Sequence, residues 1–311
     1  MVTKNNRIAI LMGGPSREAE VSRATGRAVH DALQSLGYDT VLLEYDPPRV
    51  AAQLKEAGAE AVFLALHGKY GEDGTIQGML ELLGLPYTGC GVMASAVTMD
   101  KIMSSRLFQG EGIRMASSRP YFVRDGGAYA AEDILRRFAL PVVLKPACEG
   151  STIGIEIVKA AEELLPAVQR VFSIEPRLLA ETYLDGEEFT VSILDGQAFP
   201  VIQICPHSGA YDYHSKYTKG ATDYLVPAPV PEALAREMQA MALAGYRAAE
   251  CEGAVRFDFR TDAAGVPFLL EANSIPGMTA TSLVPKAAQA AGLDFPHLCE
   301  RILQGARTGK V

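Results

Sequence analysis

Cysteine is scarce in this sequence of 311 residues. The five cysteines stand far apart, at positions 90, 148, 205, 251 and 299. This spacing excludes a C-x-x-C metal clip, and it also excludes the dense disulfide framework of a small secreted protein. We therefore expect free thiols in a reducing compartment.

Long hydrophobic runs are absent from the start of the chain. The first apolar run covers only residues 8–12 before Gly13. A membrane span needs about 20 apolar residues, and a secretory signal also has a longer apolar region. We expect a cytoplasmic protein with no membrane partner.

Positive charge is in deficit. Lysine and arginine together number 29, against 37 aspartates and glutamates, which gives a net charge of -8. Proteins that bind nucleic acid usually present a basic surface to the phosphate backbone, so we expect no nucleic-acid partner. Hydrophobic residues make up 48% of the chain, which is enough for a large core. At about 100 to 200 residues per domain, the length allows two or three domains.

The first 95 or so residues alternate between strand and helix patterns. Apolar runs at residues 7–12, 40–43 and 61–66 predict short buried strands, and helical periodicity covers residues 16–36 and 50–57. This alternation is typical of a parallel sheet with helices on its faces. Ligands of such sheets bind beyond the carboxyl ends of the strands, where Gly13, Gly14, His67 and Gly68 stand.

The pattern changes after Pro141. Short strands are predicted at residues 142–145, 154–159, 178–181 and 189–194, with a helix at 161–171, which is typical of an α+β domain with an antiparallel sheet. Residues 206–231 show little apolar periodicity, so they predict a long loop of the kind that often serves as a functional lid. A helix at 231–249 and strands at 255–260 and 268–272 complete the expected elements.

The last two predicted strands carry three oxygen-bearing side chains. A turn at residues 261–265 would bring Asp258 close to Glu271 and Asn273, and the latter two share a face of their strand. Two carboxylates and an amide oxygen suit magnesium, which keeps positions for water and for nucleotide phosphates. Arg256 shares the face of Asp258 and could neutralise a transferring phosphoryl group. The alternative is a solvated strand face that binds nothing.

A loop of glycine and hydroxyl residues lies between two of the predicted strands. Its residues are Glu149, Gly150, Ser151, Thr152 and Gly154. Together with Lys145 on the preceding strand, the backbone N–H groups of this loop could hold phosphates. The loop is not a Walker motif, because no G-K-[ST] follows and no helix begins behind it. The alternative interpretation is a simple turn.

Residues 181–184, followed by Glu187 and Glu188, end another predicted strand. Backbone groups at this point could meet the edge of an adenine, and a carboxylate could bind ribose hydroxyls. An acidic exposed turn explains these residues equally well when they are taken alone.

Six segments of the sequence strongly resemble the D-alanine:D-alanine ligases of the ATP-grasp superfamily. They are GGPSREAEVS (13–22), LHGKYGEDGTIQGMLELLGLPYTGCGVMASAVTMDK (66–101), VVLKPACEGSTIG (142–154), YDYHSKY (211–217), VRFDF (255–259) and LLEANSIPGMTATSLVP (269–285). The resemblance implies an ATP-grasp fold of mixed α/β and α+β class. Its parts would be an N-terminal parallel-sheet domain (1–97), a central subdomain (98–185) and a C-terminal subdomain (186–311), the last two being α+β subdomains that enclose ATP.

The resemblance also implies which residues bind ATP and metal. Those for ATP are Lys101, Lys145, Glu149, Gly150, Ser151, Glu181, Thr182, Tyr183, Leu184, Glu188, Lys216, Leu270 and Asn273. Asp258, Glu271 and Asn273 would bind two magnesium ions, or manganese in their place. Cys148 and Thr152 depart from the family's loop, where a basic or polar residue and a serine are common, and ATP affinity is the property that these departures would change.

The residues for the amino-acid substrates are implied in the same way. Glu18 matches the carboxylate that fixes the ammonium group of a first D-alanine, with His67 nearby. Ser282 and Leu283 match the residues at the carboxylate of a second D-alanine.

Five residues are implied to act in the reaction itself. Arg256 and the backbone N–H of Gly277 match groups that hold a developing oxyanion. Tyr217 matches a tyrosine that hydrogen-bonds toward Ser151 and Glu18 in relatives whose product is a dipeptide.

The implied reaction has two steps and serves peptidoglycan synthesis. The carboxylate of the first D-alanine attacks the γ-phosphate of ATP, and the amine of the second then attacks the resulting acyl phosphate. The resemblance also implies a homodimer. The alternatives are a relative with a different acceptor, such as D-lactate, D-serine or an amino acid of a secondary-metabolite pathway, and a catalytically silent nucleotide-binding protein.

Overall fold

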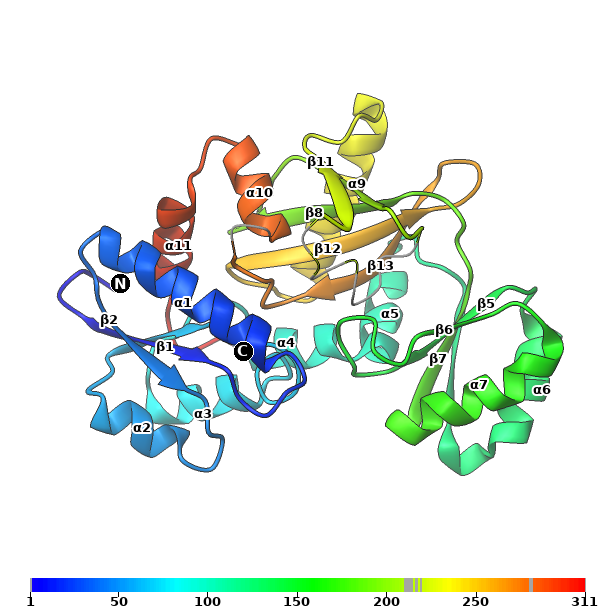
Figure 1. Ribbon diagram of the computed structural model, residues 1–311, viewed down its shortest axis with the longest axis horizontal. Helices are drawn as coiled ribbons and strands as arrows, with labels where there is room; N and C mark the ends of the chain where they lie inside the picture. The colour runs from blue at the N-terminus through cyan, green and yellow to red at the C-terminus, as the bar shows by residue number, and fades with distance from the viewer. Residues whose placement is uncertain (1, 210–214, 216–217, 219, 280–281, 311) are drawn as a thin grey trace.

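The structure is a computed structural model that describes residues 2–209, 215, 218, 220–279 and 282–310. These residues form three sheets, which follow one another along the longest axis of the molecule (Figure 1). The N-terminal sheet lies at one end and a four-stranded sheet at the other, with a six-stranded sheet between them. The three sheets fall within residues 1–97, 98–185 and 186–311 respectively, and we refer to these parts as the N-terminal, central and C-terminal units.

The N-terminal sheet is parallel, with the strand order β2-β1-β3. Its strands and helices are β1 (Arg7–Met12), α1 (Ala19–Ser35), β2 (Asp39–Glu44), α2 (Val50–Glu56), β3 (Ala61–Leu64), α3 (Thr75–Leu83) and α4 (Val92–Met99). Helix α1 covers one face of this sheet, and α2 and α3 cover the other (Figure 1). The predicted alternation of strands and helices is confirmed, except that β3 ends two residues early.

The central sheet is antiparallel, with the strand order β4-β7-β5-β6. Its elements are α5 (Lys101–Gly110), β4 (Ser118–Phe122), a short 3₁₀ turn (Val123–Asp125), α6 (Gly127–Arg137), β5 (Val142–Pro146), β6 (Glu156–Val158), α7 (Ala161–Ile174) and β7 (Arg177–Thr182). Helices α6 and α7 pack against the sheet through a separate buried core. This packing leaves the other face of the sheet turned toward the C-terminal unit.

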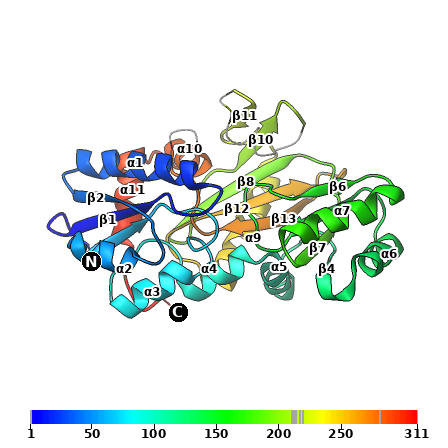
Figure 2. The same cartoon turned by 60° about the horizontal axis from the view of Figure 1, so that its bottom comes forward.

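The C-terminal sheet is also antiparallel, with the order β11-β10-β8-β12-β13 and with β9 paired to β8. Its elements are β8 (Glu188–Leu194), β9 (Gln197–Ala198), β10 (Ile202–Pro206), β11 (Thr222–Leu225), α9 (Glu232–Ala248), β12 (Ala254–Thr261) and β13 (Pro267–Asn273). Figure 2 shows β10 and β11 at the outer edge of this sheet.

The prediction of one continuous loop at residues 206–231 is wrong. Thr222–Leu225 forms β11, which pairs with β10 from Pro206 to Gln203. Its sequence, Thr-Asp-Tyr-Leu, contains neither a continuous apolar run nor an alternation of apolar and polar residues, so no strand pattern could be recognised there. Its backbone hydrogen bonds to β10 stabilise the strand where the sequence pattern gives no signal.

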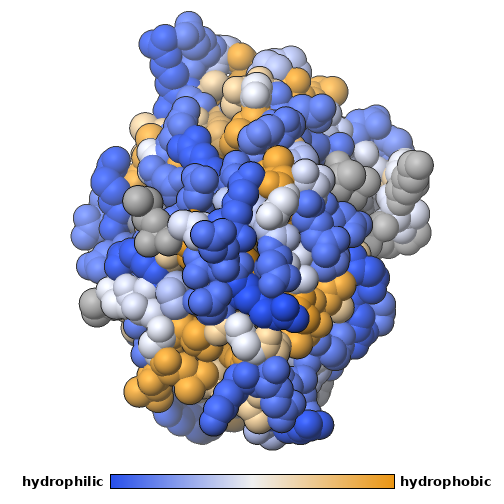
Figure 3. Space-filling model, turned by 90° about the vertical axis from the view of Figure 1, so that its left-hand side faces the viewer, coloured by the Kyte–Doolittle hydropathy of each residue, from blue (hydrophilic) through white to orange (hydrophobic). Residues whose placement is uncertain are grey.

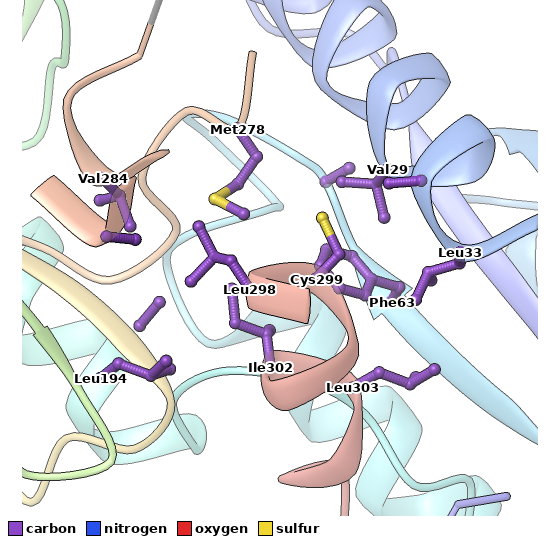
Figure 4. Close-up of a cluster of buried hydrophobic side chains, with 14 of the residues drawn as sticks. Val29, Leu33, Phe63, Leu194, Met278, Val284, Leu298, Cys299, Ile302 and Leu303 are labelled. Atoms are coloured by element: carbon purple, nitrogen blue, oxygen red, sulfur yellow. The ribbon is translucent and has the colours of Figure 1, made fainter. Parts of the chain in front are cut away.

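A shared core joins the two ends of the chain. Helices α10 (Leu283–Ala290) and α11 (Phe295–Gln304) follow the last strand and return to the N-terminal sheet. Figure 4 shows side chains of α11 packed between α1, β3 and β8; the labelled residues are Val29, Leu33, Phe63, Leu194, Met278, Val284, Leu298, Cys299, Ile302 and Leu303. The C-terminal helices therefore fix the N-terminal unit to the C-terminal one.

Within the described ranges, no helix is both long and apolar enough to cross a bilayer. The five cysteines are free thiols, and Cys90, Cys251 and Cys299 are buried.

Candidate active site

Two cavities lie side by side where the three sheets meet. The first has a volume of about 450 Å³ and lies between the start of α1, the end of β3, the loop after β5, the start of β12 and the end of β13. The second has a volume of about 280 Å³ and lies between the central and C-terminal sheets. Glu271 lines both cavities, so the two share a wall.

Most of the predicted site residues line these cavities. The first contains Glu18, His67, Gly150, Ser151, Arg256, Glu271, Asn273, Gly277, Ser282 and Leu283. The second contains Lys145, Glu181, Thr182, Tyr183, Leu184, Glu188, Asp258, Leu270 and Glu271. Lys101 and Glu149 line neither cavity, but the Lys101 Nζ lies 3.6 Å from Glu271 and donates to the Glu149 carbonyl at 2.6 Å. Lys216 and Tyr217 lie outside the described residues.

Strand β1 leads into the first cavity through a glycine turn. Gly13 and Gly14 have φ angles of 76° and 90°, a conformation that favours glycine. The Gly13 N–H donates to the Ser22 hydroxyl at 2.8 Å, and that hydroxyl donates to the Ala65 carbonyl at 2.6 Å. These bonds fix the start of α1 against the end of β3, which places Glu18 at the cavity.

The loop after β5 closes the first cavity on another side. Ser151 and Thr152 have φ angles of 50° and 64°, a region that residues with side chains rarely occupy outside functional loops. The Ser151 hydroxyl donates a hydrogen bond to the Glu18 carboxylate. Gly150 lies so close that a Cβ there would stand 3.0 Å from the same carboxylate. The central and N-terminal units therefore meet at Glu18.

Two titratable side chains of the first cavity have shifted pKa values. His67 is buried, and this burial lowers its pKa, so the ring is neutral at pH 7. Glu72 accepts the Gly68 N–H at 2.6 Å, and burial together with the nearby Glu18 raises the pKa of Glu72 to about 8. Glu72 was not predicted as a site residue, although the acidic, glycine-rich segment GEDG just past a strand end was a signal for it.

The hairpin of β12 and β13 brings the predicted metal-binding side chains together. Asp258 pairs directly with Glu271 across the strands, and Arg256 pairs with Asn273. Arg256 contacts both oxygens of Asp258, at 2.8 and 2.9 Å, and the Asn273 amide donates to Asp258 at 3.1 Å. The described residues contain no group of three or more His, Cys, Asp or Glu side chains placed to hold a metal. The two carboxylates and the amide are nevertheless a donor set of the hard oxygen type that magnesium prefers.

The second cavity has a buried ion pair in its wall. Lys145 on β5 and Glu181 on β7 form this pair, and both are less than one-tenth exposed. Burial opposes the charge of Lys145, but Glu181, Glu271 and Glu188 outweigh it and raise the pKa of the lysine. A lysine held charged in this way can meet the phosphates of a nucleotide.

The rim of the second cavity carries an ion pair next to an aromatic ring. Glu188 on β8 pairs with Arg260 on β12 at 3.0 Å, and the Arg260 guanidinium lies 5.3 Å from the centre of the Tyr183 ring. The predicted residues at 181–184 therefore lie beside a carboxylate and a planar aromatic surface, as a nucleoside site requires.

A parallel-sheet unit joined to two antiparallel units, with a cavity between the latter and an acidic hairpin in its wall, is the architecture of the ATP-grasp ligases. Family models described as D-ala D-ala ligase N-terminus and C-terminus match residues 46–90 and 118–304. The D-alanine--D-alanine ligase of Anaeromyxobacter sp. (strain K) is 47% identical over 300 residues, which cover 96% of each chain.

Solved structures agree with these sequence matches. The D-alanine--D-alanine ligase of Bacillus anthracis complexed with ATP has a TM-score of 0.85 at 34% identity, covering 96% of this chain and 97% of that one. The VanG D-Ala:D-Ser ligase of Enterococcus faecalis has a TM-score of 0.84 at 27% identity, covering 96% and 99%. The chain belongs to the D-alanine–D-alanine ligase family, which confirms the resemblance and the fold class that the sequence implied.

Proposed function

We propose that this chain joins two molecules of D-alanine into D-alanyl-D-alanine for peptidoglycan synthesis, while converting ATP to ADP and phosphate. The observation that carries the proposal is the shared wall at Glu271, because it puts the phosphate end of the second cavity beside the first. A nucleotide in one cavity can therefore phosphorylate a substrate in the other without either of them moving.

The second cavity is the proposed ATP site. The backbone at 181–184 faces the adenine, and Glu188 binds the ribose hydroxyls after it leaves its contact with Arg260. Lys145, Lys101 and the loop from Glu149 to Ser151 hold the phosphates, with Leu270 under the nucleotide. Lys216 is proposed to join them from outside the described residues.

The first cavity is the proposed amino-acid site. Glu18, with His67 nearby, holds the ammonium group of the first D-alanine, and Ser282 and Leu283 hold the carboxylate of the second. Arg256 and the Gly277 N–H face the carbonyl oxygen, where negative charge develops. Tyr217 is proposed to complete the contact between Ser151 and Glu18, which favours an amide product.

Asp258, Glu271 and Asn273 are the residues proposed to hold two magnesium ions, or manganese. When bound, the metal supplies positive charge that neutralises the phosphate oxygens. Cationic side chains contact both of these carboxylates: Arg256 pairs with Asp258 at 2.8 Å, and the Lys101 Nζ lies 3.6 Å from Glu271. These contacts offset the negative charge of the hairpin.

The chemistry demands positioning more than covalent participation by the protein. The first carboxylate attacks the γ-phosphate and ADP leaves, and the second amine then attacks the acyl phosphate, loses a proton and expels phosphate. The cavities bring the reacting groups together, and Arg256 stabilises the charge that forms. Excluding water prevents hydrolysis of the acyl phosphate.

The test is ADP release with ATP and magnesium, measured without amino acid and with D-alanine, L-alanine, D-alanine plus D-lactate or D-alanine plus D-serine. We expect ADP release that depends on D-alanine, with the mass of D-alanyl-D-alanine in the product. If D-alanine adds nothing to a slow ATPase background, the proposal is wrong. A mixed product formed in preference would instead assign the chain to a different acceptor, as in the VanG relative.

A matched pair of variants makes this test sharper. Glu271→Gln removes a charge from the shared wall and should lower kcat/KM by about 100-fold or more. Glu237→Gln removes an exposed surface carboxylate that pairs with Arg114 at 2.8 Å, and it should stay within about twofold of the wild type. Equal activity of the two variants would contradict the proposed role of Glu271.

We further propose a homodimer that works in the cytoplasm. Leu82 on α3 is 91% exposed, and Leu83 on the same helix and Met93 on α4 are also exposed. Figure 3, which views the molecule from the N-terminal unit, has apolar residues gathered near its lower edge, at the height of α2 and α3 in Figure 1. Light scattering after size exclusion would give twice the mass of 33.3 kDa if the proposal holds.

A further inference from the structure

The base of the proposed phosphate loop is held by one arginine. Arg177, at the start of β7, contacts side chains from three segments. Its Nη1 lies 2.5 Å from an Asp100 oxygen, its Nε lies 3.1 Å from a Glu175 oxygen, and its Nη2 lies 2.8 Å from the Cys148 sulfur. Both carboxylates are only 13% exposed. The contacts of a planar guanidinium with three partners define one geometry, because its N–H groups point in fixed directions.

Each partner of Arg177 fixes a piece of backbone. Asp100 caps helix α5 by accepting the N–H groups of Ile102 and Met103 at 2.9 and 3.1 Å. The second oxygen of Glu175 accepts the Cys148 N–H at 2.7 Å. The arginine therefore links the first turn of α5 to the first residue of the loop.

These two pieces of backbone carry the proposed phosphate-binding groups. The N–H of Lys101, the residue after the cap, donates to the Ala147 carbonyl at 2.8 Å, and its Nζ donates to the Glu149 carbonyl at 2.6 Å. The loop continues through Gly150 and Ser151 to the Glu18 contact. A shift of Arg177 would thus be transmitted to Lys101 and to the loop together.

The thiol among these contacts is neutral. Burial, with Glu175 and Asp100 close by, raises the pKa of Cys148 to about 11. The sulfur therefore accepts a hydrogen bond from Arg177 without adding a negative charge. The positive charge of the guanidinium is then shared between two carboxylates only, those of Asp100 and Glu175.

We propose that Arg177 is a positioning residue for ATP. Arg177 lines neither of the two cavities. It acts by setting the geometry of Lys101 and of the loop at 148–154, the groups proposed to hold the phosphates. This inference rests on the assignment of the second cavity to ATP. It predicts that loss of Arg177 weakens ATP binding and leaves the D-alanine site as it was.

The test compares five variants, one of them the double variant Arg177→Gln/Asp100→Asn. The KM of ATP, the KM of D-alanine and the thermal midpoint are measured for each, together with the calorimetric Kd of ATP in the presence of magnesium. Arg177→Gln removes the charge, and Arg177→Lys keeps the charge without the planar fork. Asp100→Asn keeps a good helix cap and loses the ion pair. The matched control is Arg170→Gln, because Arg170 on α7 pairs with Glu156 at 2.8 Å on the outside of the same unit.

We expect Arg177→Gln to raise the KM and the Kd of ATP about tenfold or more, and to change the KM of D-alanine by less than about twofold. Arg177→Lys should fall between this variant and the wild type. Adding Asp100→Asn to Arg177→Gln should raise the Kd of ATP little further, because the ion pair between Asp100 and Arg177 is already lost in Arg177→Gln.

Three results would overturn the inference. One is an ATP affinity of Arg177→Gln equal to that of Arg170→Gln. Another is an equal rise in the KM of ATP and the KM of D-alanine for Arg177→Gln. The third is a lower thermal midpoint of Arg177→Gln with an unchanged Kd of ATP, which would mean that Arg177 only stabilises the fold. If the wild type forms no dipeptide, the proposed function fails, but the Kd of ATP still decides the role of Arg177.

Discussion

At the residue scale, the first cavity changes the acidity of its own side chains. The pKa of Glu72 rises from about 4.5 to about 8 through burial and the neighbouring Glu18. The folded protein therefore holds a proton on Glu72 that the unfolded chain releases between these two pH values. Stability is thus lost as the pH rises through this window, because only the unfolded state gains from ionisation.

Glu72→Gln should remove this pH dependence. The amide keeps an acceptor for the Gly68 N–H and has no proton to lose. We expect the free energy of unfolding of the variant, minus that of the wild type, to increase by about 1 kcal/mol or more between pH 5 and pH 8. Urea denaturation at both pH values measures this difference, in which titrating groups that do not interact with Glu72 cancel. If the free energy of unfolding of the variant, minus that of the wild type, is the same at both pH values, the pKa of Glu72 is not raised.

Site residues that lie close together in the sequence, on one predicted hairpin, could be predicted better than residues whose partners are distant in the sequence. Asp258, Glu271 and Asn273 could be brought near one another on paper, because a short turn joins their two strands. The direct pairing of Asp258 with Glu271 depends on a β-bulge between Asp258 and Phe259, which the sequence did not predict. Arg177 could not be predicted in this way, since it acts through a fold that connects distant segments. The contact of Arg177 with Asp100 spans 77 positions of the chain, and no local period encodes it.

At the scale of elements, helix α11 determines how the two ends of the chain meet. Its buried residues Leu298, Cys299, Ile302 and Leu303 recur at intervals of one, three and one, as on one face of a helix. This spacing was a readable signal, yet no helix was predicted there. The prediction succeeded for the parallel strands of the first 66 residues, where each run is largely apolar.

Leu298→Ala should destabilise the protein by about 3 kcal/mol, because it leaves a cavity in the core that α11 shares with α1. Leu135→Ala on α6 is the matched control: this leucine is exposed and lies outside the surface proposed for the homodimer, so its loss should cost less than about 1 kcal/mol. Chemical denaturation of both variants gives the comparison. Similar losses in the two would mean that α11 does not carry the packing shown in Figure 4.

At the scale of the whole molecule, the last described residues tie the units together. The Lys310 ammonium is buried and donates to the carbonyls of Tyr87 and Gly89 at 2.7 and 2.6 Å. Glu81 accepts the backbone N–H of Lys310 at 3.0 Å, and the Arg307 Nε donates to Glu252 at 3.0 Å. The tail therefore spans from the N-terminal unit to the turn before β12.

Lys310→Met should lower the free energy of unfolding by about 2 kcal/mol. It fills the same space, but it removes the Lys310 donor from the Gly89 carbonyl and leaves the Tyr87 carbonyl with only the Arg307 N–H at 3.3 Å. Lys159→Met, at an exposed position of the central unit, should change it by less than about 0.5 kcal/mol. Thermal unfolding of the two variants side by side would show whether the ammonium matters. Equal free energies of unfolding of the two variants would show that the hydrogen bonds of Lys310 do not stabilise the contact between the units.

The wall that Glu271 contributes to both cavities has a thermodynamic consequence. With ATP in the second cavity and D-alanine in the first, as proposed, both substrates would interact with the same carboxylate, so their binding would be linked. Linkage is reciprocal: if ATP changes the affinity for D-alanine by some factor, D-alanine must change the affinity for ATP by the same factor. A single titration in one direction therefore predicts the result of the titration in the other.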